Sequence, residues 1–289
     1  MNNLKIITAG PGAGKTYNLK NEAINCLSNL DRNRFCAVIT YTNAATAELR
    51  QRISSEIPIP PNIFIGTIHS FLIRFVIEPF GHLLKMVPLE KKYIDNVKSN
   101  DHRKKNAVQK KLSDKGVITF DKVLQLSKEI IKTRSIKEAL NNRLQFLFVD
   151  EYQDSKKNTH DFFLKIIKNA KTSYFIGDKL QYIYGFTKRY NKTNDLSVTS
   201  FVNLMNIYPD NIDKIQINYR SSEAIVQFLN NYIETEFEQR SKKGNNGIPI
   251  YFINCTKSEA IIDSYNQLKI QHEINKIHCT SIEKKINYF

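Results

Sequence analysis

A glycine-rich turn between a predicted strand and a predicted helix constrains the fold of this 289-residue chain more than any other feature. Residues 4–9 are largely apolar and predict a short buried strand, and residues 15–30 carry apolar side chains at helical spacing. Between them runs the sequence Ala9-Gly10-Pro11-Gly12-Ala13-Gly14-Lys15-Thr16. The junction predicts an α/β fold whose first turn wraps an anion with backbone N–H groups.

Each residue type in this turn has a chemical reason to be there. Glycine reaches backbone angles closed to other residues, so successive N–H groups can converge on phosphate oxygens, next to the positive end of the following helix. Lys15 is placed to reach the β- and γ-phosphates of a nucleoside triphosphate, and the Thr16 hydroxyl is placed to ligate magnesium. The strict pattern has glycine where this chain has Ala9. The alternative, a glycine turn without a ligand, is disfavoured because Gly-Lys-Thr sits at the strand-to-helix junction.

A second motif lies about 135 residues further on, where four apolar residues, 146–149, precede Asp150 and Glu151. The apolar run predicts a strand in the middle of a parallel sheet. Asp150 at its carboxyl end is a candidate magnesium ligand, and Glu151 is a candidate base for a water that attacks the γ-phosphate. Two acids after a strand are often only the start of a solvated loop. The pairing with the phosphate turn favours the catalytic interpretation.

Strands and helices alternate through the first three quarters of the chain. Further strands are predicted at 35–40, 63–67 and 173–177, and helices at 44–55 and 70–80. This alternation is typical of a doubly wound parallel sheet. Such sheets bind ligands beyond the carboxyl ends of their strands, where both motifs lie.

The net charge of +15, with a pI of about 9.5, points to a polyanionic partner such as nucleic acid. A compositional bias toward lysine, asparagine and isoleucine is the competing explanation. The segment 84–134 shows no clear strand and is rich in lysine and arginine, so we expect an inserted, mostly helical subdomain that faces phosphates. For any single lysine, a solvated surface position remains the alternative.

Two features of composition bear on the compartment. The four cysteines show no metal-ligand spacing and suit a reduced, cytoplasmic protein. No apolar run approaches the roughly 20 residues that a membrane-spanning helix needs, so no membrane partner is expected.

Three further segments follow predicted strands: 40–50 (TYTNAATAELR), 66–71 (GTIHSF) and 177–186 (GDKLQYIYGF). A fourth segment, 217–222 (INYRSS), comes after them. With the two motifs above, they resemble motifs I, Ia, Ib, II, III and IV of superfamily 1 DNA helicases of the UvrD/Rep/PcrA type. The resemblance extends from the N-terminus to about residue 230. It implies a RecA-like P-loop NTPase fold, ATP with Mg²⁺ at the nucleotide site, and 3′-to-5′ movement on single-stranded DNA.

The resemblance also implies roles for single residues. Gln181 would sense the γ-phosphate, Tyr219 would stack on adenine, and the Arg220 guanidinium would reach the γ-phosphate from a second domain. Four residues would contact single-stranded DNA: Tyr41, Asn43, His69 and Phe186. Aromatic stacking suits a motor that is indifferent to sequence. For each aromatic residue, burial under the helix layer is the alternative.

Two departures from the family pattern stand out. The segment before the phosphate turn holds no glutamine that could recognise adenine, and residues 223–289 match neither motif V nor motif VI. The expected organisation is a RecA-like ATP-binding domain over 1–83 and 135–213, the basic helical insertion over 84–134, and a partial second RecA-like domain over 214–289. Within the last domain, helices are expected at 222–232 and at 258 to about 270, and a strand at 248–253.

Two functions remain open on the sequence. The first is an ATP-dependent DNA helicase or translocase that hydrolyses ATP and is weak alone. The second is a truncated, non-motor ATP-binding subunit that docks on a protein partner such as a nuclease. The absence of motifs V and VI favours the second function, whereas the intact residues of the ATP site favour the first.

Overall fold

The structure is a computed structural model that describes residues 3–85, 92–95, 97, 101–167, 170–179, 181, 200–232, 238–251 and 258–272. The chain divides into two compact units, Met1–Gln216 and Ile217–Phe289. We describe each unit by itself.

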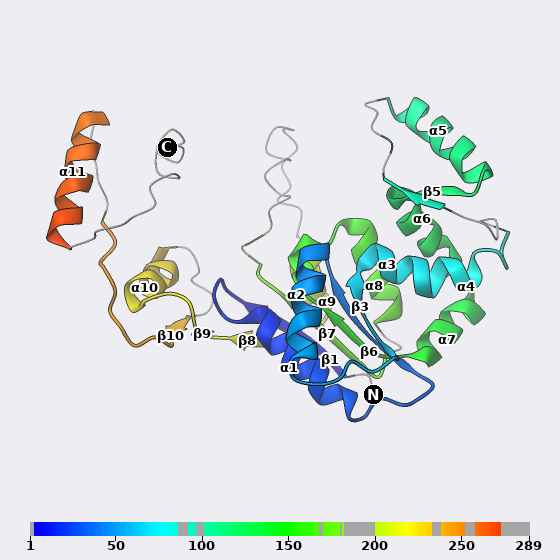
Figure 1. Ribbon diagram of the computed structural model, residues 1–289, viewed down its shortest axis with the longest axis horizontal. Coiled ribbons are helices and arrows are strands. Elements are labelled where there is room, and N and C mark those ends of the chain that lie inside the picture. Colours follow the sequence, from blue (N-terminus) through cyan, green and yellow to red (C-terminus); the bar gives the residue numbers. More distant parts are fainter. Residues whose placement is uncertain are drawn as a thin grey trace. The chain divides into compact units, whose positions relative to one another are not determined.

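A six-stranded sheet forms the centre of the first unit (Figure 1). Its strands are β1 (Asn3–Ala9), β2 (Phe35–Thr40), β3 (Ile63–Thr67), β6 (Leu144–Val149), β7 (Thr172–Gly177) and β8 (Ile212–Ile215). They lie in the order β3-β2-β6-β7-β1-β8, and every neighbouring pair is parallel. The predicted α/β fold with a parallel sheet is therefore confirmed, and it is the fold of a RecA-like P-loop NTPase.

Strands β2 and β6 are buried along their whole length, which explains their unbroken apolar runs. Alternate side chains enter two separate cores. Phe35, Ala37 and Ile39 point into one core, while Cys36 and Val38 point into the other. The sheet is thus covered on both faces, as its sequence pattern requires.

Helices α1 (Lys15–Leu27) and α2 (Asn43–Ser54) cover the face that carries Val38. The opposite face is covered by α3 (Ile68–Leu72), α6 (Phe120–Ile130), α7 (Arg134–Arg143), α8 (Lys157–Ile166) and α9 (Ser200–Ile207). The predicted helix at 70–80 differs in two respects. It begins at Ile68, and a π-helical segment, η1 (Ile73–Ile77), separates α3 from α4 (Glu78–Phe80).

Within the segment 84–134, the structure adds two short strands to the expected helices. Strand β4 (Lys92–Ile94) pairs in parallel with β5 (Val117–Thr119), and α5 (His102–Asp114) connects them. Strands of three residues are too short to leave a periodic pattern in the sequence. Helix α6 follows β5 directly, and its Val123 and Ile130 enter the core of the first unit.

The second unit contains β9 (Ile217–Asn218), α10 (Glu223–Tyr232), β10 (Arg240–Ser241) and α11 (Ser258–Gln271) among its described residues. Both helices match the expected ranges. The strand expected over 248–253 is wrong for residues 248–251, which form no strand in the described part of this unit. Ile248 and Ile250 are 46% and 40% exposed, so among the described residues this apolar run is not covered by a partner strand.

Candidate nucleotide site

The glycine turn joins the carboxyl end of β1 to the first residue of α1. Gly12 and Gly14 have φ angles of 76° and 73°, in the left-handed region, and Gly14 is the N-cap of α1. The Ala13 N–H donates to the Gly10 carbonyl at 3.3 Å and tightens the turn. The sequence therefore folds locally as a loop at a helix N-terminus, which is a favourable place for an anion.

Lys15 is the first residue of α1 and is only 8% exposed. Its Nζ lies 3.8 Å from Oδ2 of Asp178, the residue that follows β7. The ammonium group is thus held at the carboxyl edge of the sheet by a carboxylate from a neighbouring strand. A phosphate group at this edge would take over part of that ion pairing.

Thr16 and Asp150 lie side by side, as the predicted magnesium site requires. The Thr16 hydroxyl donates to Asp150 Oδ2 at 3.1 Å, and the Asp150 N–H donates to the Ile39 carbonyl at 3.0 Å. Burial and the neighbouring Glu151 carboxylate raise the pKa of Asp150 to about 6, against the Thr16 hydrogen bond and the charge of Lys15. A cation beside this buried carboxylate would favour its charged form.

The donor set suits Mg²⁺ better than a metal that needs many protein ligands. No group of three or more His, Cys, Asp or Glu side chains gathers around a metal position within the residues that the structure describes. Magnesium binds in proteins through one or two hard oxygen ligands and completes its shell with water and substrate phosphates. The hydroxyl of Thr16 and the carboxylate of Asp150 fit this requirement.

Glu151 has an unusual backbone conformation that aims its side chain. Its φ is 46°, in the left-handed region, and for a residue with a side chain this costs on the order of 1–3 kcal/mol. The carboxylate accepts a hydrogen bond from Gln153 Nε2 at 2.6 Å, and Gln153 Oε1 accepts one from the Asp178 N–H at 2.9 Å. A Cβ at Gly177 would lie 2.7 Å from Gln153 Oε1, so the glycine makes room for this link.

Sequence reasoning did not predict Gln153 or Asp178 as site residues. Gln153 is 2% exposed, lies in the short 3₁₀ helix η2 (Tyr152–Asp154), and connects the acidic pair to the end of β7. Both residues sit next to predicted ones, in segments already singled out. The available signal was a polar residue close behind a buried strand: Asp178 directly follows β7, and Gln153 is the fourth residue after β6.

Gln181 and Phe186 belong to the segment that follows β7. The Gln181 N–H donates to the Asp178 carbonyl at 3.2 Å, which places the Gln181 backbone at the same edge of the sheet as the phosphate turn. Phe186 lies outside the residues that the structure describes. The predicted role of each side chain stays a prediction.

The three other residues predicted to contact DNA follow β2 and β3, on the same edge. Asn43 is exposed as the first residue of α2. Tyr41 is half-buried against the core, and its hydroxyl shares a hydrogen bond with Ser155. Tyr41 is thus partly buried, the alternative kept open for each aromatic residue, and this limits the ring surface left for a base.

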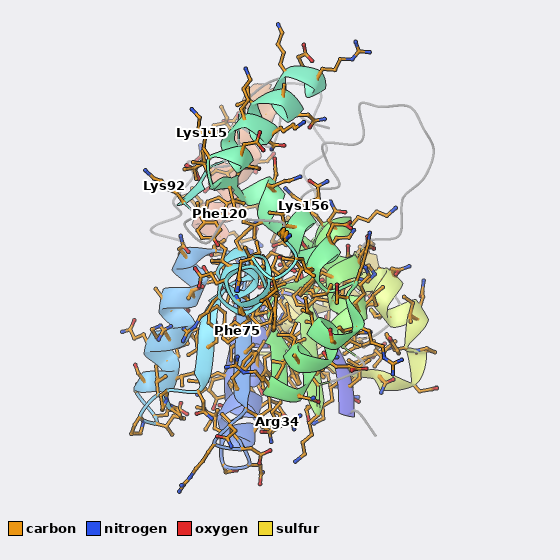
Figure 2. All side chains as sticks on the ribbon, turned by 90° about the vertical axis from the view of Figure 1, so that its right-hand side faces the viewer. Arg34, Phe75, Lys92, Lys115, Phe120 and Lys156 are labelled. Carbon is orange, nitrogen blue, oxygen red and sulfur yellow. The ribbon has the colours of Figure 1, made fainter. Side chains whose placement is uncertain are left out.

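His69 is half-buried, and its ring lies 5.2 Å from the ring of Phe120, the first residue of α6. Burial lowers the pKa of His69; the nearby Lys156 lowers it further, and Asp121 raises it. Figure 2 labels Phe120 and Lys156 in the same part of the first unit. The contact of Phe120 with His69 was not predicted. The available signal was an aromatic residue that follows a basic segment of the sequence.

The second unit presents Tyr219 and Arg220 on a turn. Both side chains are exposed, Tyr219 by 53%. The buried side chain of Asn218 shapes the turn, because its Oδ1 accepts from the N–H groups of Arg220 and Ser221, each at 2.9 Å. Its Nδ2 donates to Gln239 Oε1 at 3.0 Å. Asn218 is a positioning residue that sequence reasoning passed over.

The structure brings Lys15, Thr16, Asp150 and Glu151 together at the carboxyl edge of the sheet in the first unit, whereas Tyr219 and Arg220 belong to the second unit. Within the described residues, no helix has the length and apolar character to cross a membrane.

Comparison with known proteins agrees with this geometry. A family model described as "AAA domain" matches residues 1–187. The chain is 23% identical to the ATP-dependent DNA helicase PcrA of Staphylococcus aureus (strain Mu50), over 82% of this chain and 39% of that protein. It is also 23% identical to the ATP-dependent DNA helicase Rep of Buchnera aphidicola, over 98% of this chain and 50% of that protein.

A third relative is the Gabija protein GajB of Bacillus cereus (strain VD045), which is 29% identical over 62% of this chain and 37% of its own length. The chain thus spans half or less of the length of each of these relatives. The matched family model covers more than half of the chain and includes the whole nucleotide site of the first unit. The chain therefore belongs to the AAA domain family and is related to the UvrD/Rep/PcrA-like superfamily 1 helicases.

Proposed function

We propose that this protein binds ATP with Mg²⁺ at the carboxyl edge of its parallel sheet, hydrolyses it, and uses the cycle to move 3′-to-5′ on single-stranded DNA. The hydrogen-bonded constellation of Thr16, Asp150, Glu151 and Gln153 beside the buried Lys15 carries this proposal. The names of the PcrA and Rep relatives, both ATP-dependent DNA helicases, support it.

Binding would use the backbone of the glycine turn and two side chains. The N–H groups at the start of α1 donate to phosphate oxygens, and Lys15 exchanges its ion pair with Asp178 for the β- and γ-phosphates. Thr16 and Asp150 would hold Mg²⁺, which supplies charge neutralisation on the phosphates when bound. The side chain of Tyr219 would stack on the adenine ring.

Hydrolysis would transfer the γ-phosphoryl group to water and leave ADP. Glu151 takes the proton of the attacking water, and the hydrogen bond from Gln153 keeps the Glu151 carboxylate in one orientation. Gln181 contacts the γ-phosphate, and Arg220 stabilises the charge that develops on it. Because Arg220 belongs to the second unit, hydrolysis would require the two units to come together around the nucleotide.

Single-stranded DNA would lie along the exposed Asn43 after β2 and the half-buried His69 after β3, with the predicted Phe186 as a stacking residue. Helix α5 and the turn after it add a basic surface. Its exposed members are Arg103, Lys104, Lys110, Lys111 and Lys115. These cations would bind phosphates without regard to base sequence.

The test is ATP hydrolysis with and without an oligo(dT) strand, followed by displacement of a 3′-tailed duplex. Stimulation of hydrolysis by the strand, together with movement from the 3′ end, supports the proposed motor. ATP binding without DNA-stimulated hydrolysis would favour the alternative, an ATP-binding subunit that docks on a protein partner such as a nuclease. Failure to bind ATP would overturn both.

The basic surface has its own test in the salt dependence of DNA binding. Replacing Lys110 and Lys111 with Gln should lower the slope of log K against log salt by about 1.4, because each lost contact with a single strand removes ~0.7. The matched control replaces Lys171 and Lys243, two exposed lysines elsewhere, and should leave the slope unchanged. If the Lys110/Lys111 variant and the Lys171/Lys243 variant have equal salt slopes, the lysines of helix α5 do not contact DNA phosphates.

A further inference from the structure

The first unit has a concave site at the amino edge of the sheet, away from the phosphate turn. A pocket of about 360 Å³ opens where β2 and β3 begin, and Arg143, the last residue of α7, is part of its lining. Four arginines line it: Arg32, Arg34, Arg74 and Arg143. None of the residues that line it is acidic. We propose that this arginine pocket is a docking site for an acidic segment of a protein partner, whose carboxylates pair with the guanidinium groups.

Aromatic rings form the floor of the arginine pocket and hold its shape. Phe75 stacks on Phe35 with ring centroids 4.1 Å apart and an interplanar angle of 16°, and it meets Phe64 edge-on at 5.3 Å. The guanidinium carbon of Arg74 lies 5.4 Å from the centre of the Phe75 ring. The π-helical segment η1 carries both Arg74 and Phe75, so an irregular turn of the helix presents these two neighbours at the pocket.

The guanidinium groups of the pocket keep N–H groups that can donate to a bound partner. Arg34 uses its Nε for the Asn142 carbonyl at 2.7 Å, and its Nη1 lies at a loose 3.9 Å from Asp31. Arg32, Arg74 and Arg143 have exposed side chains. A guanidinium group fits a carboxylate with two parallel hydrogen bonds, and an aromatic floor lowers the local dielectric around that pair.

The choice of arginine is the strongest sign of a specific partner. Only 11 of the 43 basic residues in the chain are arginines, yet four of the 11 line this pocket and no lysine does. A general surplus of positive charge would place mostly lysines here. Arginine and aromatic residues are enriched, and lysine is depleted, where proteins bind one another.

The position of the pocket argues against nucleic acid as its occupant. The phosphate turn and the predicted DNA contacts lie at the carboxyl ends of the strands, and the pocket lies at the amino ends, about 17–20 Å away along a strand of this length. Figure 2 shows Arg34 and Lys115 at opposite ends of the first unit, so the arginine pocket is also separate from the lysine-rich surface of α5. A partner bound here would leave the nucleotide edge accessible.

Fluorescence anisotropy with a labelled acidic peptide, Asp-Glu-Phe-Asp-Glu, tests the proposal on the full chain. We expect saturable binding with a Kd below about 1 mM. Arg74→Gln/Arg143→Gln should weaken it at least tenfold. Arg74→Lys/Arg143→Lys keeps the charge but loses the planar fork, and it should weaken binding at least threefold. This lysine variant also serves if the glutamine variant does not fold.

The matched control is Arg52→Gln/Arg134→Gln, which removes two exposed arginines of the same unit outside the pocket. It should stay within twofold of the unmodified protein, and excess oligo(dT) should not displace the peptide. Three results would overturn the proposal: no binding up to about 1 mM, equal weakening in the pocket and control variants, or competition by oligo(dT) that the pocket variants abolish. ATP affinity, measured on the same variants, tests the nucleotide site separately and should not change.

Discussion

The two halves of the predicted nucleotide site are built in different ways. In the first unit, Thr16 and Asp150 are hydrogen-bonded across 134 residues of sequence, and Lys15 is almost fully buried. In the second unit, Tyr219 and Arg220 are exposed, and they lie on a turn whose backbone is held by the side chain of Asn218. The residues of the first unit are preorganised by a sheet, whereas the side chains of Tyr219 and Arg220 project from a turn and are exposed. We therefore expect mutations in the first unit to change the hydrolysis of ATP or the binding of its phosphates. We expect mutations of Tyr219 and Arg220 to change how the second unit engages the bound nucleotide.

The largest effect should come from Glu151→Gln. The amide keeps the size of the side chain but cannot accept the proton of water, so the rate of ATP hydrolysis should fall on the order of 10²–10⁴-fold while ATP binding persists. Phosphate release and titration calorimetry measure the two quantities separately. A wild-type rate in this variant would show that the acidic pair is not catalytic.

The next effect should come from Lys15→Ala. Loss of a charge-assisted contact with phosphate costs about 1.5–3 kcal/mol, so ATP affinity should fall by roughly 10–100-fold. Replacing the exposed Lys171 with Ala is the control and should leave affinity unchanged. If both variants bind ATP equally, the glycine turn does not hold phosphates.

A smaller effect should come from Tyr219→Ala in the second unit. An aromatic pair contributes about 0.5–1.5 kcal/mol beyond its buried area, which predicts a two- to tenfold loss of ATP affinity. Tyr219→Phe keeps the ring and should bind normally. If Tyr219→Ala lowers ATP affinity as much as Lys15→Ala does, the second unit contributes as much to ATP binding as the first. The contrast between the two units would then be wrong.

The smallest effect should appear in the pH dependence of stability. The folded protein holds the pKa of His69 below its ordinary value of 6.5, so the unfolded chain binds more protons between that lowered pKa and 6.5. The free energy of unfolding should therefore decrease as the pH falls through this window. His69→Gln should flatten the decrease in denaturant titrations at successive pH values. An unchanged slope would mean that His69 is not protected by burial.

The sequence predicted the strands at 35–40 and 63–67 without error, because buried strands of a parallel sheet are apolar runs. It missed β8, whose Asp213 and Lys214 are exposed at the edge of the sheet and interrupt the apolar pattern. Lys15, Thr16, Asp150 and Glu151 were predicted to lie near one another because each follows a strand of a parallel sheet, and the structure places them at the same edge; their chemical roles stay predictions.

Other residues could not be predicted because their positions depend on contacts between segments that are distant in the sequence. The role of Gln153 follows from the backbone conformation of Glu151 and from the close approach of β7, which a linear sequence does not show. The arginine pocket gathers residues from four separate segments, at 32–35, 61–64, 74–75 and 143. Only the three-dimensional fold brings such segments together.

Strand β8 has a mechanical consequence. It pairs with β1 over Ile6–Ala9, and a single residue, Gln216, separates it from the first strand of the second unit. Any tension that develops in the connection between the units is therefore carried as shear along the hydrogen bonds between β8 and β1. Strand β1 ends at Ala9, where the glycine turn begins, so the strand that bears this load is also the one that leads into the phosphate loop.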